Sequence, residues 1–270
     1  MRTILYDYHV HSLISPDSNA TMESMCEQAI RLGLKELAFT EHYEYQDLGE
    51  KNAGYFSAER LALYERTLNK CKRAYENQLY IARAAELGQP HLELGHSRLL
   101  IKEMHFDFIL GSVHQNDYGH IDKIDITEGN YLSVIENYYR HLLWLSQVGD
   151  FDCLAHLDMV KRHTSRRGLP DAHEQFRPIM EKILNTIIER GRGIELNVSG
   201  IRQAPKESMP GLDLLKYYRE HGGEIITAGS DAHSPKDIAS NFSQAYDLLT
   251  EAGFRYITTF RERKPSFHKL

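Results

Sequence analysis

The stretch Ile4-Leu5-Tyr6-Asp7-Tyr8-His9-Val10-His11-Ser12 decides how the rest of the chain is interpreted. Its first three residues form an apolar run, which is typical of a buried strand. Because side chains alternate between the two faces of a strand, His9 and His11 point to the same side, about 7 Å apart along it. Two imidazoles so placed can bind one metal ion. An isolated His-x-His pair also occurs in strands that bind nothing, so the later sequence must decide between these interpretations.

Length and composition indicate a chain that folds around a large core. Its 270 residues suffice for one large domain or two small ones, and 41% hydrophobic residues with 26% charged residues are ordinary for a globular protein. The 32 basic and 38 acidic residues give a net charge of −6, which argues against a nucleic-acid partner but not against a local basic pocket. No apolar run approaches the roughly 18 residues of a membrane span, so we expect no membrane association.

The cysteines predict a reducing compartment. Cys26, Cys71 and Cys153 are odd in number, far apart in the sequence and without a Cys-x-x-Cys pair. This pattern is typical of free thiols in a cytoplasmic protein. Cys26 also falls on the apolar stripe of a predicted helix, which favours a core position over a ligand role. No feature of the sequence fixes the oligomeric state.

Predicted strands alternate with predicted helices along the chain. We expect seven strong strands and a weaker eighth, at residues 4–12, 36–40, 79–85, 106–114, 152–156, 194–198, 224–230 and 256–260. The first helix between them begins at the N-cap Thr21 and ends at Gly33, and the segment 43–56 is expected to be a long loop. Such alternation, without a break in composition, predicts parallel βα units in a single domain over residues 1–270. Their number predicts a closed (β/α) barrel.

Histidines and carboxylates gather at the carboxyl ends of these predicted strands. They are His9, His11, His42, Glu86, His114, His156, Asp231 and His233. A barrel brings all of these strand ends to one mouth. A single zinc ion binds about four ligands, and this set is larger. It suits two or three ions, with a carboxylate shared between two of them. The alternative is that these are unrelated core and surface residues, but several strands would then end in histidine by coincidence.

In their order along the chain, these motifs resemble the polymerase and histidinol phosphatase (PHP) family of metal-dependent phosphoesterases. The motifs are His9-Val10-His11, Thr40-Glu41-His42, Glu86, Ser112-Val113-His114, Ala155-His156 and Ser230-Asp231-Ala232-His233. The stretches around Asp7 to Asp17 and Glu41 resemble the histidinol-phosphate phosphatase branch. The resemblance implies a distorted (β/α)7 barrel of the TIM type with its metal site at the carboxyl ends of the strands. The eighth strand would then be an extra edge element.

The resemblance also implies which residues hold which ion. The first ion would take His9, His11, Glu86 and Asp231; the second Glu86, His114 and His156; and the third Asp17, His42 and His233. Glu86 would bridge the first two ions, and Glu86, Asp231 and His233 would also be catalytic. Some family members carry a histidine where this chain has Asp17, and an oxygen ligand there favours manganese or iron over zinc. The expected cofactors are therefore two to three divalent ions of zinc, manganese or iron.

The expected chemistry follows from these ions. A water between two divalent ions loses a proton near neutral pH, so we expect a metal-bridging hydroxide to attack the phosphorus of a phosphomonoester. The resemblance implies that the substrate is L-histidinol phosphate, cleaved to L-histidinol and phosphate in histidine biosynthesis. The alternatives are a phosphatase of the same family for nucleotides or phosphotyrosine, and a non-catalytic accessory module. The complete set of metal ligands and the lack of a basic stripe argue against the accessory module.

Phosphate also needs protein cations. Arg162 and Arg202 follow the fifth and sixth strands and are the best candidates for a phosphate clamp, with Lys161 and Lys206 in the same loops as substitutes. The nearby Arg166 and Arg167 read as solvated surface charges. Recognition of an imidazole and an ammonium could fall to Tyr43, Glu44, Tyr45 and Gln46, or to Gln115 and Tyr118. His120 and His163 lie in expected mouth loops, Trp144 is expected in the core, and His268 in a polar tail.

Overall fold

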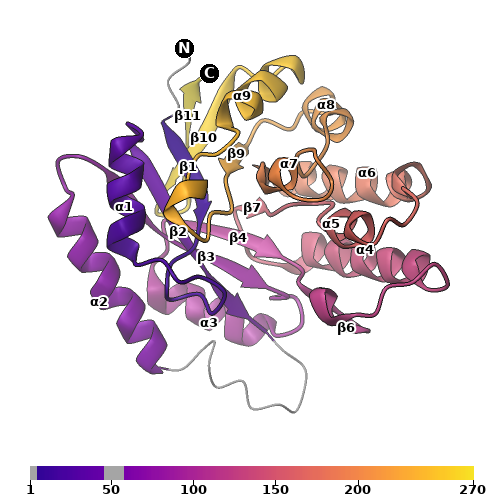
Figure 1. Ribbon diagram of the computed structural model, residues 1–270, viewed down its shortest axis with the longest axis horizontal. Helices are drawn as coiled ribbons and strands as arrows, with labels where there is room; N and C mark the ends of the chain where they lie inside the picture. The colour runs from indigo at the N-terminus through magenta and orange to yellow at the C-terminus, as the bar shows by residue number, and fades with distance from the viewer. Residues whose placement is uncertain (1–4, 46–57) are drawn as a thin grey trace.

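Seven parallel strands form one sheet that curls into a nearly closed barrel (Figure 1). The computed structural model describes residues 5–45 and 58–270. The sheet order is β1-β2-β3-β4-β7-β8-β9. The strands are β1 (Tyr6–Val10), β2 (Glu36–Glu44), β3 (Tyr80–Gly88), β4 (Phe108–Ser112), β7 (Cys153–Leu154), β8 (Gly193–Asn197) and β9 (Ile226–Gly229). The predicted (β/α)7 architecture is confirmed.

The barrel closes between β1 and the chain that follows β9. Val10 forms a parallel bridge with Ala232, and the backbone N–H of His11 donates to the carbonyl of Ala232 over 2.9 Å. The N–H of Asp231 donates to the carbonyl of His9 over 2.8 Å. This closure places the histidines at the end of the first strand directly beside the aspartate that follows the last one.

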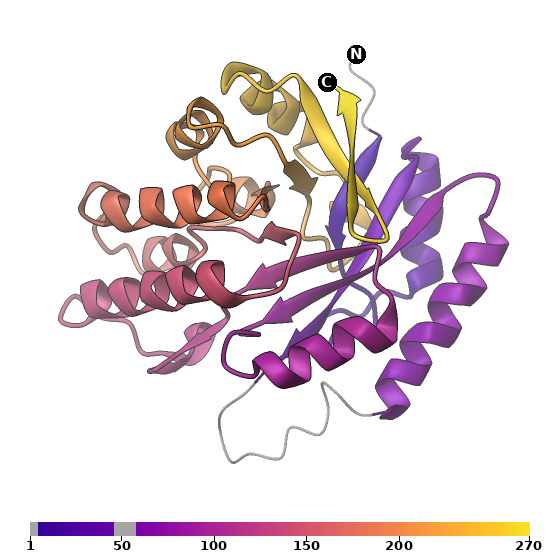
Figure 2. The ribbon, with the colours of Figure 1, turned by 180° about the vertical axis from the view of Figure 1, so that it is seen from behind.

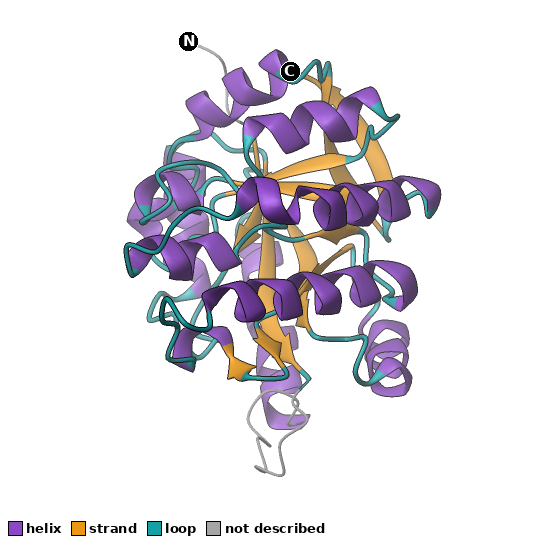
Figure 3. Ribbon diagram, turned by 90° about the vertical axis from the view of Figure 1, so that its right-hand side faces the viewer, coloured by secondary structure: helices purple, strands orange, loops and turns teal. Residues whose placement is uncertain are grey.

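Helices surround the barrel (Figures 1 and 3). They are α1 (Met22–Arg31), α2 (Ala58–Ala74), α3 (Leu94–Met104), α4 (Tyr131–Val148), α5 (Val160–Arg166), α6 (His173–Glu189), α7 (Ser199–Arg202), α8 (Leu212–Glu220) and α9 (Phe242–Glu251), with the short 3-10 helices η1 (Ile121–Lys123) and η2 (Pro235–Asp237). The predicted ends of α1 are confirmed, because the Thr21 side chain accepts from the N–H of Ser24 and Gly33 has a φ of +77°. No described helix is long and apolar enough to cross a membrane.

Two elements differ from the sequence-based expectation. β2 runs on to Glu44, so that Tyr43 and Glu44, expected in the loop, belong to the strand, and His42 lies within it and not just past its end. Polar residues interrupt the apolar pattern there because they face a buried polar cluster and not solvent. The remainder of that expected loop, with Gln46, lies outside the described residues. Trp144 was expected in the core but is 45% exposed, with its ring 4.9 Å from that of His91 at the surface of α4.

The C-terminal hairpin closes the opposite end of the barrel (Figure 2). β10 (Tyr256–Arg261) pairs antiparallel with β11 (Lys264–Lys269), so the predicted eighth strand is not a barrel strand. Arg261 contacts Glu36, the first residue of β2, and Arg263 contacts Asp152, directly before β7. These contacts hold the hairpin at the amino ends of the strands. The prediction of a polar tail around His268 is wrong, because this residue lies in β11 and its Nε2 is 2.8 Å from Thr259 Oγ1.

A short hairpin and a 3-10 turn stand between β4 and α4. β5 (Gln115–Asn116) pairs with β6 (Gly119–His120), and η1 follows at once. The N–H of Ile121 donates to the carbonyl of His114 over 2.9 Å, which ties η1 to the carboxyl end of β4. This insertion therefore lies at the same end of the barrel as the predicted metal-binding residues.

Candidate metal centre

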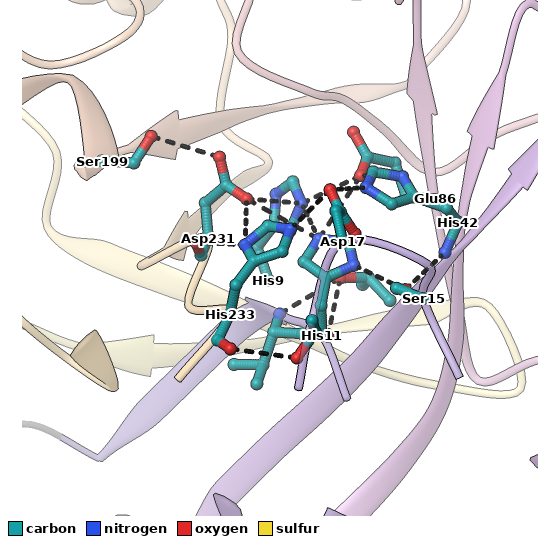
Figure 4. A network of polar contacts seen from close by, with 12 residues as sticks. His9, His11, Ser15, Asp17, His42, Glu86, Ser199, Asp231 and His233 are labelled. Atoms are coloured by element: carbon teal, nitrogen blue, oxygen red, sulfur yellow. Dashed lines mark hydrogen bonds and ion pairs between the residues drawn. The ribbon is translucent and has the colours of Figure 1, made fainter. Parts of the chain in front are cut away.

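The nine predicted ligands come together at the carboxyl ends of the barrel strands. Figure 4 shows His9, His11, Asp17, His42, Glu86, Asp231 and His233. Three of the nine lie within strands, and a fourth comes directly after one. β1 carries His9 and is followed directly by His11, β2 carries His42, and β3 carries Glu86. The other five follow strands: Asp17 in the β1–α1 loop, His114 after β4, His156 after β7, and Asp231 and His233 after β9. Most of their side chains are buried, whereas the Asp17 carboxylate is 53% exposed.

The first group joins His9, His11, Glu86 and Asp231, which converge in Figure 4. His9 Nε2 lies 3.0 Å from His11 Nε2, 3.1 Å from Glu86 Oε2 and 3.7 Å from Asp231 Oδ1. His11 Nε2 lies 3.5 Å from the same Glu86 oxygen and 3.6 Å from the same Asp231 oxygen. Ligands about 2.0–2.2 Å from a tetrahedral ion lie roughly 3.3–3.6 Å from one another. The spacing of these donor atoms therefore fits one divalent ion.

The second group is built on the other oxygen of Glu86. Its Oε1 lies 2.8 Å from His156 Nε2 and 3.1 Å from His114 Nε2. Glu86 thus turns one carboxylate oxygen toward each group of histidines, with its side chain only 1% exposed. This is the arrangement of a carboxylate that is shared between two cations.

The third group lies toward solvent. Asp17 Oδ2 is 3.3 Å from His42 Nε2 and 3.1 Å from His233 Nε2. The ring of His11 stacks at 4.3 Å on the rings of both histidines, so this group adjoins the first. His42 Nδ1 also lies 3.1 Å from Glu86 Oε2, which connects the third group to the shared carboxylate.

A buried glutamate that the sequence analysis missed supports two of these groups. Glu195 Oε1 is 2.6 Å from His9 Nδ1, and Glu195 Oε2 accepts the backbone N–H of His156 over 3.0 Å. A carboxylate on the outer nitrogen of a histidine fixes the ring and leaves Nε2 free to bind a cation. The signal for this role is in the sequence, because Glu195 stands inside an apolar strand between Ile194 and Leu196.

Other contacts hold the rings of His114 and His11 in the same way. Glu44 Oε1 is 2.6 Å from His114 Nδ1, and its Oε2 accepts from Gln89 Nε2 over 2.9 Å. His11 Nδ1 is 3.1 Å from Ser15 Oγ, which in turn donates to Glu41. These residues orient the histidines, and Glu44 is engaged with the cluster and not free to bind a substrate amine.

The acids and histidines of this cluster shift one another's pKa values. Burial raises the pKa of Glu86, but the neighbouring imidazoles, His9 first among them, outweigh burial and hold that pKa well below its usual value. Burial lowers the pKa of His114, but the carboxylates of Glu44 and Glu86 outweigh it and raise the pKa to about 10. Divalent cations bound here would take over this neutralising role from protons on the histidines. The acidic, histidine-rich donor set therefore fits divalent metal ions.

A cleft of about 210 Å³ opens above the cluster, and Arg162 is the only arginine or lysine among the described residues that line it. Its guanidinium donates to Asp231 Oδ2 over 3.2 Å and to Ser199 Oγ over 3.0 Å. Its Nε is buried and donates to none of the described residues. Arg162 is thus anchored beside the first group with donor capacity left for an anion.

The other predicted cations lie elsewhere. Arg202 does not line the cleft, and its guanidinium donates to the backbone carbonyls of Ser230 and Asp231 over 2.7 and 2.9 Å. Lys161 pairs with Asp158 in a separate cavity, and Lys206 is exposed. Arg166 and Arg167 are both exposed, as expected of surface charges, and Arg167 also donates to the carbonyls of His163 and Ile124. Arg202 is therefore placed to hold the segment that carries Asp231.

Only some of the residues predicted to contact the substrate line the cleft. Of the described residues proposed for imidazole and ammonium recognition, Glu44 lines the cleft, whereas Tyr43, Tyr45, Gln115 and Tyr118 do not. The histidines expected in mouth loops, His120 and His163, do line it, together with Ile121, Asp122 and Met159. The wall formed by η1 and α5 therefore bounds the cleft beyond the histidine cluster.

The PHP domain matches residues 7–199 of the chain. The chain belongs to the PHP domain family. Its curated relatives in this family include the histidinol-phosphatase of Lactococcus lactis subsp. lactis (strain IL1403), which is 28% identical over 263 residues that span 96% of this chain and 95% of the relative. A probable histidinol-phosphatase of Thermotoga maritima is 25% identical over 253 residues, 94% of each protein.

A solved structure in this family has the same fold. The histidinol phosphate phosphatase of Lactococcus lactis subsp. lactis Il1403, complexed with zinc, L-histidinol and phosphate, superimposes with a TM-score of 0.81 and 25% identity. The match covers 97% of this chain and 98% of that protein, so the similarity extends past the PHP match to β9 and the residues that follow it. The expected family and barrel are both confirmed.

Proposed function

We propose that this protein is a metal-dependent phosphomonoesterase that hydrolyses L-histidinol phosphate to L-histidinol and phosphate. The position of Glu86 carries the proposal, because each of its oxygens faces a separate set of histidines at 2.8–3.1 Å. Such a shared carboxylate suits a cluster of ions that acts on phosphate. The relatives named histidinol-phosphatase, and the one solved with L-histidinol and phosphate, support this choice of substrate.

The proposal includes two to three divalent ions of zinc, manganese or iron. His9, His11, Glu86 and Asp231 would hold the first, Glu86, His114 and His156 the second, and Asp17, His42 and His233 the third. The third set has the most exposed ligand, Asp17, so we expect its ion to be bound most weakly. Its carboxylate favours manganese or iron over zinc at that position.

The chain's own residues would position the ester for hydrolysis. Ions bound in the cluster would supply an activated water and neutralise charge on the phosphate. Arg162 would donate guanidinium N–H groups to phosphate oxygens, which the planar guanidinium can contact in pairs. Glu195 and Glu44 would keep the rings of His9 and His114 in register as charge shifts during the reaction. The buried walls would exclude bulk water from the reacting phosphorus.

We also propose that residues 1–270 act as one catalytic domain in the cytoplasm. The first part is supported by the single seven-stranded sheet, whose first and last strands both supply the cluster. The second part is supported by the three cysteines, which are buried and unpaired.

A substrate panel tests the proposal. Protein loaded with manganese or zinc should hydrolyse L-histidinol phosphate with a higher kcat/KM than nucleoside monophosphates, phosphotyrosine or p-nitrophenyl phosphate. The activity should disappear in chelator and return with metal. Preference for a nucleotide or for phosphotyrosine would retain the enzyme class and refute the substrate. Inactivity of the fully metal-loaded protein on the whole panel would refute the enzyme class.

A further inference from the structure

One wall of the cleft carries a carboxylate that is not among the predicted metal ligands. Five carboxylates line the cleft among the described residues: Asp17, Glu44, Glu86, Asp122 and Asp231. Three belong to the histidine cluster, and Glu44 is bonded to His114 and Gln89. Asp122, in η1, is 61% exposed and has one recorded partner, His163 Nδ1 at 3.3 Å.

That partner does not neutralise Asp122. His163 lies on α5 with its side chain 4% exposed. Burial lowers the pKa of His163 to about 4, with Arg162 and Arg167 acting in the same direction against the opposing charge of Asp122. The imidazole is therefore uncharged near neutral pH and places no positive charge beside the carboxylate. Among the described residues His163 is its one partner, so the Asp122 carboxylate has most of its hydrogen-bonding capacity left for a ligand.

The wall that carries Asp122 is held in place from both sides. Ile121, the preceding residue, is buried, and its N–H donates to the carbonyl of His114. Arg167 donates to the carbonyl of His163 on α5 and to that of Ile124 just after η1. The carboxylate is thus presented by a braced segment, which lowers the entropic cost of binding a ligand there.

The cleft would consequently have two poles. The metal cluster and Arg162 would make its inner part positive, while Asp122 makes its outer wall negative. A phosphate ester whose alcohol carries a cation would align with both poles, whereas an ester of an uncharged alcohol would use only the inner one. A charge-assisted hydrogen bond contributes about 1.5–3 kcal/mol, enough for discrimination of roughly 10- to 150-fold.

We infer that Asp122 is a specificity residue that binds the primary ammonium group of the substrate's alcohol portion. The substrate class would be phosphomonoesters of amino alcohols. This inference rests on the proposed function, because it takes the phosphate to lie on the metal cluster. It assigns to η1 the selection of the alcohol portion.

Matched substrate pairs test this role of Asp122. The first pair is L-histidinol phosphate and 3-(imidazol-4-yl)propyl phosphate, which lacks only the ammonium-bearing branch. Asp122→Asn should lower kcat/KM for the amine-bearing ester on the order of 10- to 100-fold, mainly through KM, and leave the other ester within about twofold. Metal content should be unchanged. Asp125→Asn is the matched control, because this exposed aspartate follows η1 in the same segment and does not line the cleft.

A second pair, 2-aminoethyl phosphate and ethyl phosphate, separates this inference from the proposed function. If the wild type does not favour L-histidinol phosphate but Asp122→Asn still removes a preference for 2-aminoethyl phosphate, the proposed substrate fails and Asp122 keeps its role. If the variant loses the same factor on both members of each pair, or loses nothing, Asp122 does not bind the ammonium. An equal loss in Asp125→Asn would also overturn the inference.

Discussion

The two ends of the barrel both bury carboxylates, but they neutralise them differently. At the amino ends of the strands, Arg261 lies 2.9 Å from Glu36, and Arg263 lies 3.0 Å from Asp152 and 2.6 Å from Asp150. At the carboxyl ends, the buried acids face histidines, and Arg162 is the single arginine or lysine among the described lining residues.

This difference separates structural charges from functional ones. A buried charge persists when it is paired or when it binds a metal. The arginines of the C-terminal hairpin pair the acids at one end permanently. At the other end, the acids face imidazoles, which can be neutral or protonated. Their Nε2 atoms converge, so bound metal cations can neutralise the acids. Substitutions at the mouth should therefore change metal content and catalysis, whereas those at the hairpin should change stability.

The largest effect is expected for Glu86→Ala. Loss of the shared carboxylate removes one ligand from each of two groups and leaves five histidines without the acid that they contact. The variant should bind fewer ions per chain and lose on the order of 1000-fold or more in kcat/KM. Elemental analysis beside steady-state kinetics measures both. Normal metal content with normal kinetics would rule out the bridging role.

Arg162→Lys should have the next largest effect. A lysine keeps the charge but cannot contact two phosphate oxygens as a guanidinium does. We expect kcat/KM to fall on the order of 10- to 1000-fold with metal content intact. Arg202→Lys is the matched comparison, because Arg202 donates to backbone carbonyls outside the cleft. A larger loss in Arg202→Lys than in Arg162→Lys, at equal metal content, would show that the clamp has been assigned to the wrong arginine.

Glu195→Gln should have a moderate effect, through the histidines it holds. The amide keeps the shape of the side chain but weakens the 2.6 Å contact with His9 Nδ1. Replacement of such supporting carboxylates typically costs about 10- to 100-fold in metal affinity or activity. A competition titration with a chelating dye measures the affinity. Because a merely structural role would lower stability at unchanged affinity, thermal unfolding of the metal-free variant serves as the control.

Arg263→Met, at the other end of the barrel, should leave catalysis nearly unchanged. It leaves Asp152 with only the more distant Arg192, at 3.5 Å, at a cost of about 1–3 kcal/mol, reduced from the value for a fully buried pair because Arg263 is partly exposed. Burial raises the pKa of Asp152 to about 6 despite the opposing effect of Arg263. Since this folded-state pKa exceeds the roughly 3.9 of an unfolded aspartate, ionisation of Asp152 costs stability as the pH rises through about 6.

The pH dependence sharpens that comparison. Loss of Arg263 raises the pKa of Asp152 further, so the variant should lose more stability at pH 8 than at pH 5, where the acid can be protonated. Urea unfolding of the metal-free proteins at the two pH values measures the difference. An equal loss at both values would show that Asp152 is not responsible, and a loss of kcat in the folded variant would contradict the division between the two ends.

The residues at the mouth of the barrel were largely predictable from sequence, because the barrel fold fixes which distant parts of the chain meet there. Residues that end separate strands must meet once the strands are parallel and closed, so His9, Glu86 and Asp231 could be grouped without knowledge of any contact. The same reasoning failed for a side chain in the middle of a strand. Glu195 was not singled out, because its inward direction depends on the register of β8 against its neighbours.

Residues beyond the strand ends were harder to place. Arg162 and Arg202 both follow strands, but only the structure shows that the guanidinium of one reaches the cleft and that of the other holds a backbone segment. Trp144 occupies an apolar position of α4 that the surrounding elements leave partly uncovered. Asp122 lies in an insertion whose path no periodic pattern specifies. Loop geometry decides these positions, and strand periodicity carries no information about it.

The most direct test of the account is the number of divalent ions per chain in gently purified protein, measured together with activity in chelator. The geometry of the three ligand groups predicts between two and three ions per chain and an activity that vanishes when they are removed. It also predicts that activity returns in proportion to the ions restored. Metal-free protein that retains full phosphatase activity in chelator would contradict the central claim that this cluster is a catalytic metal centre.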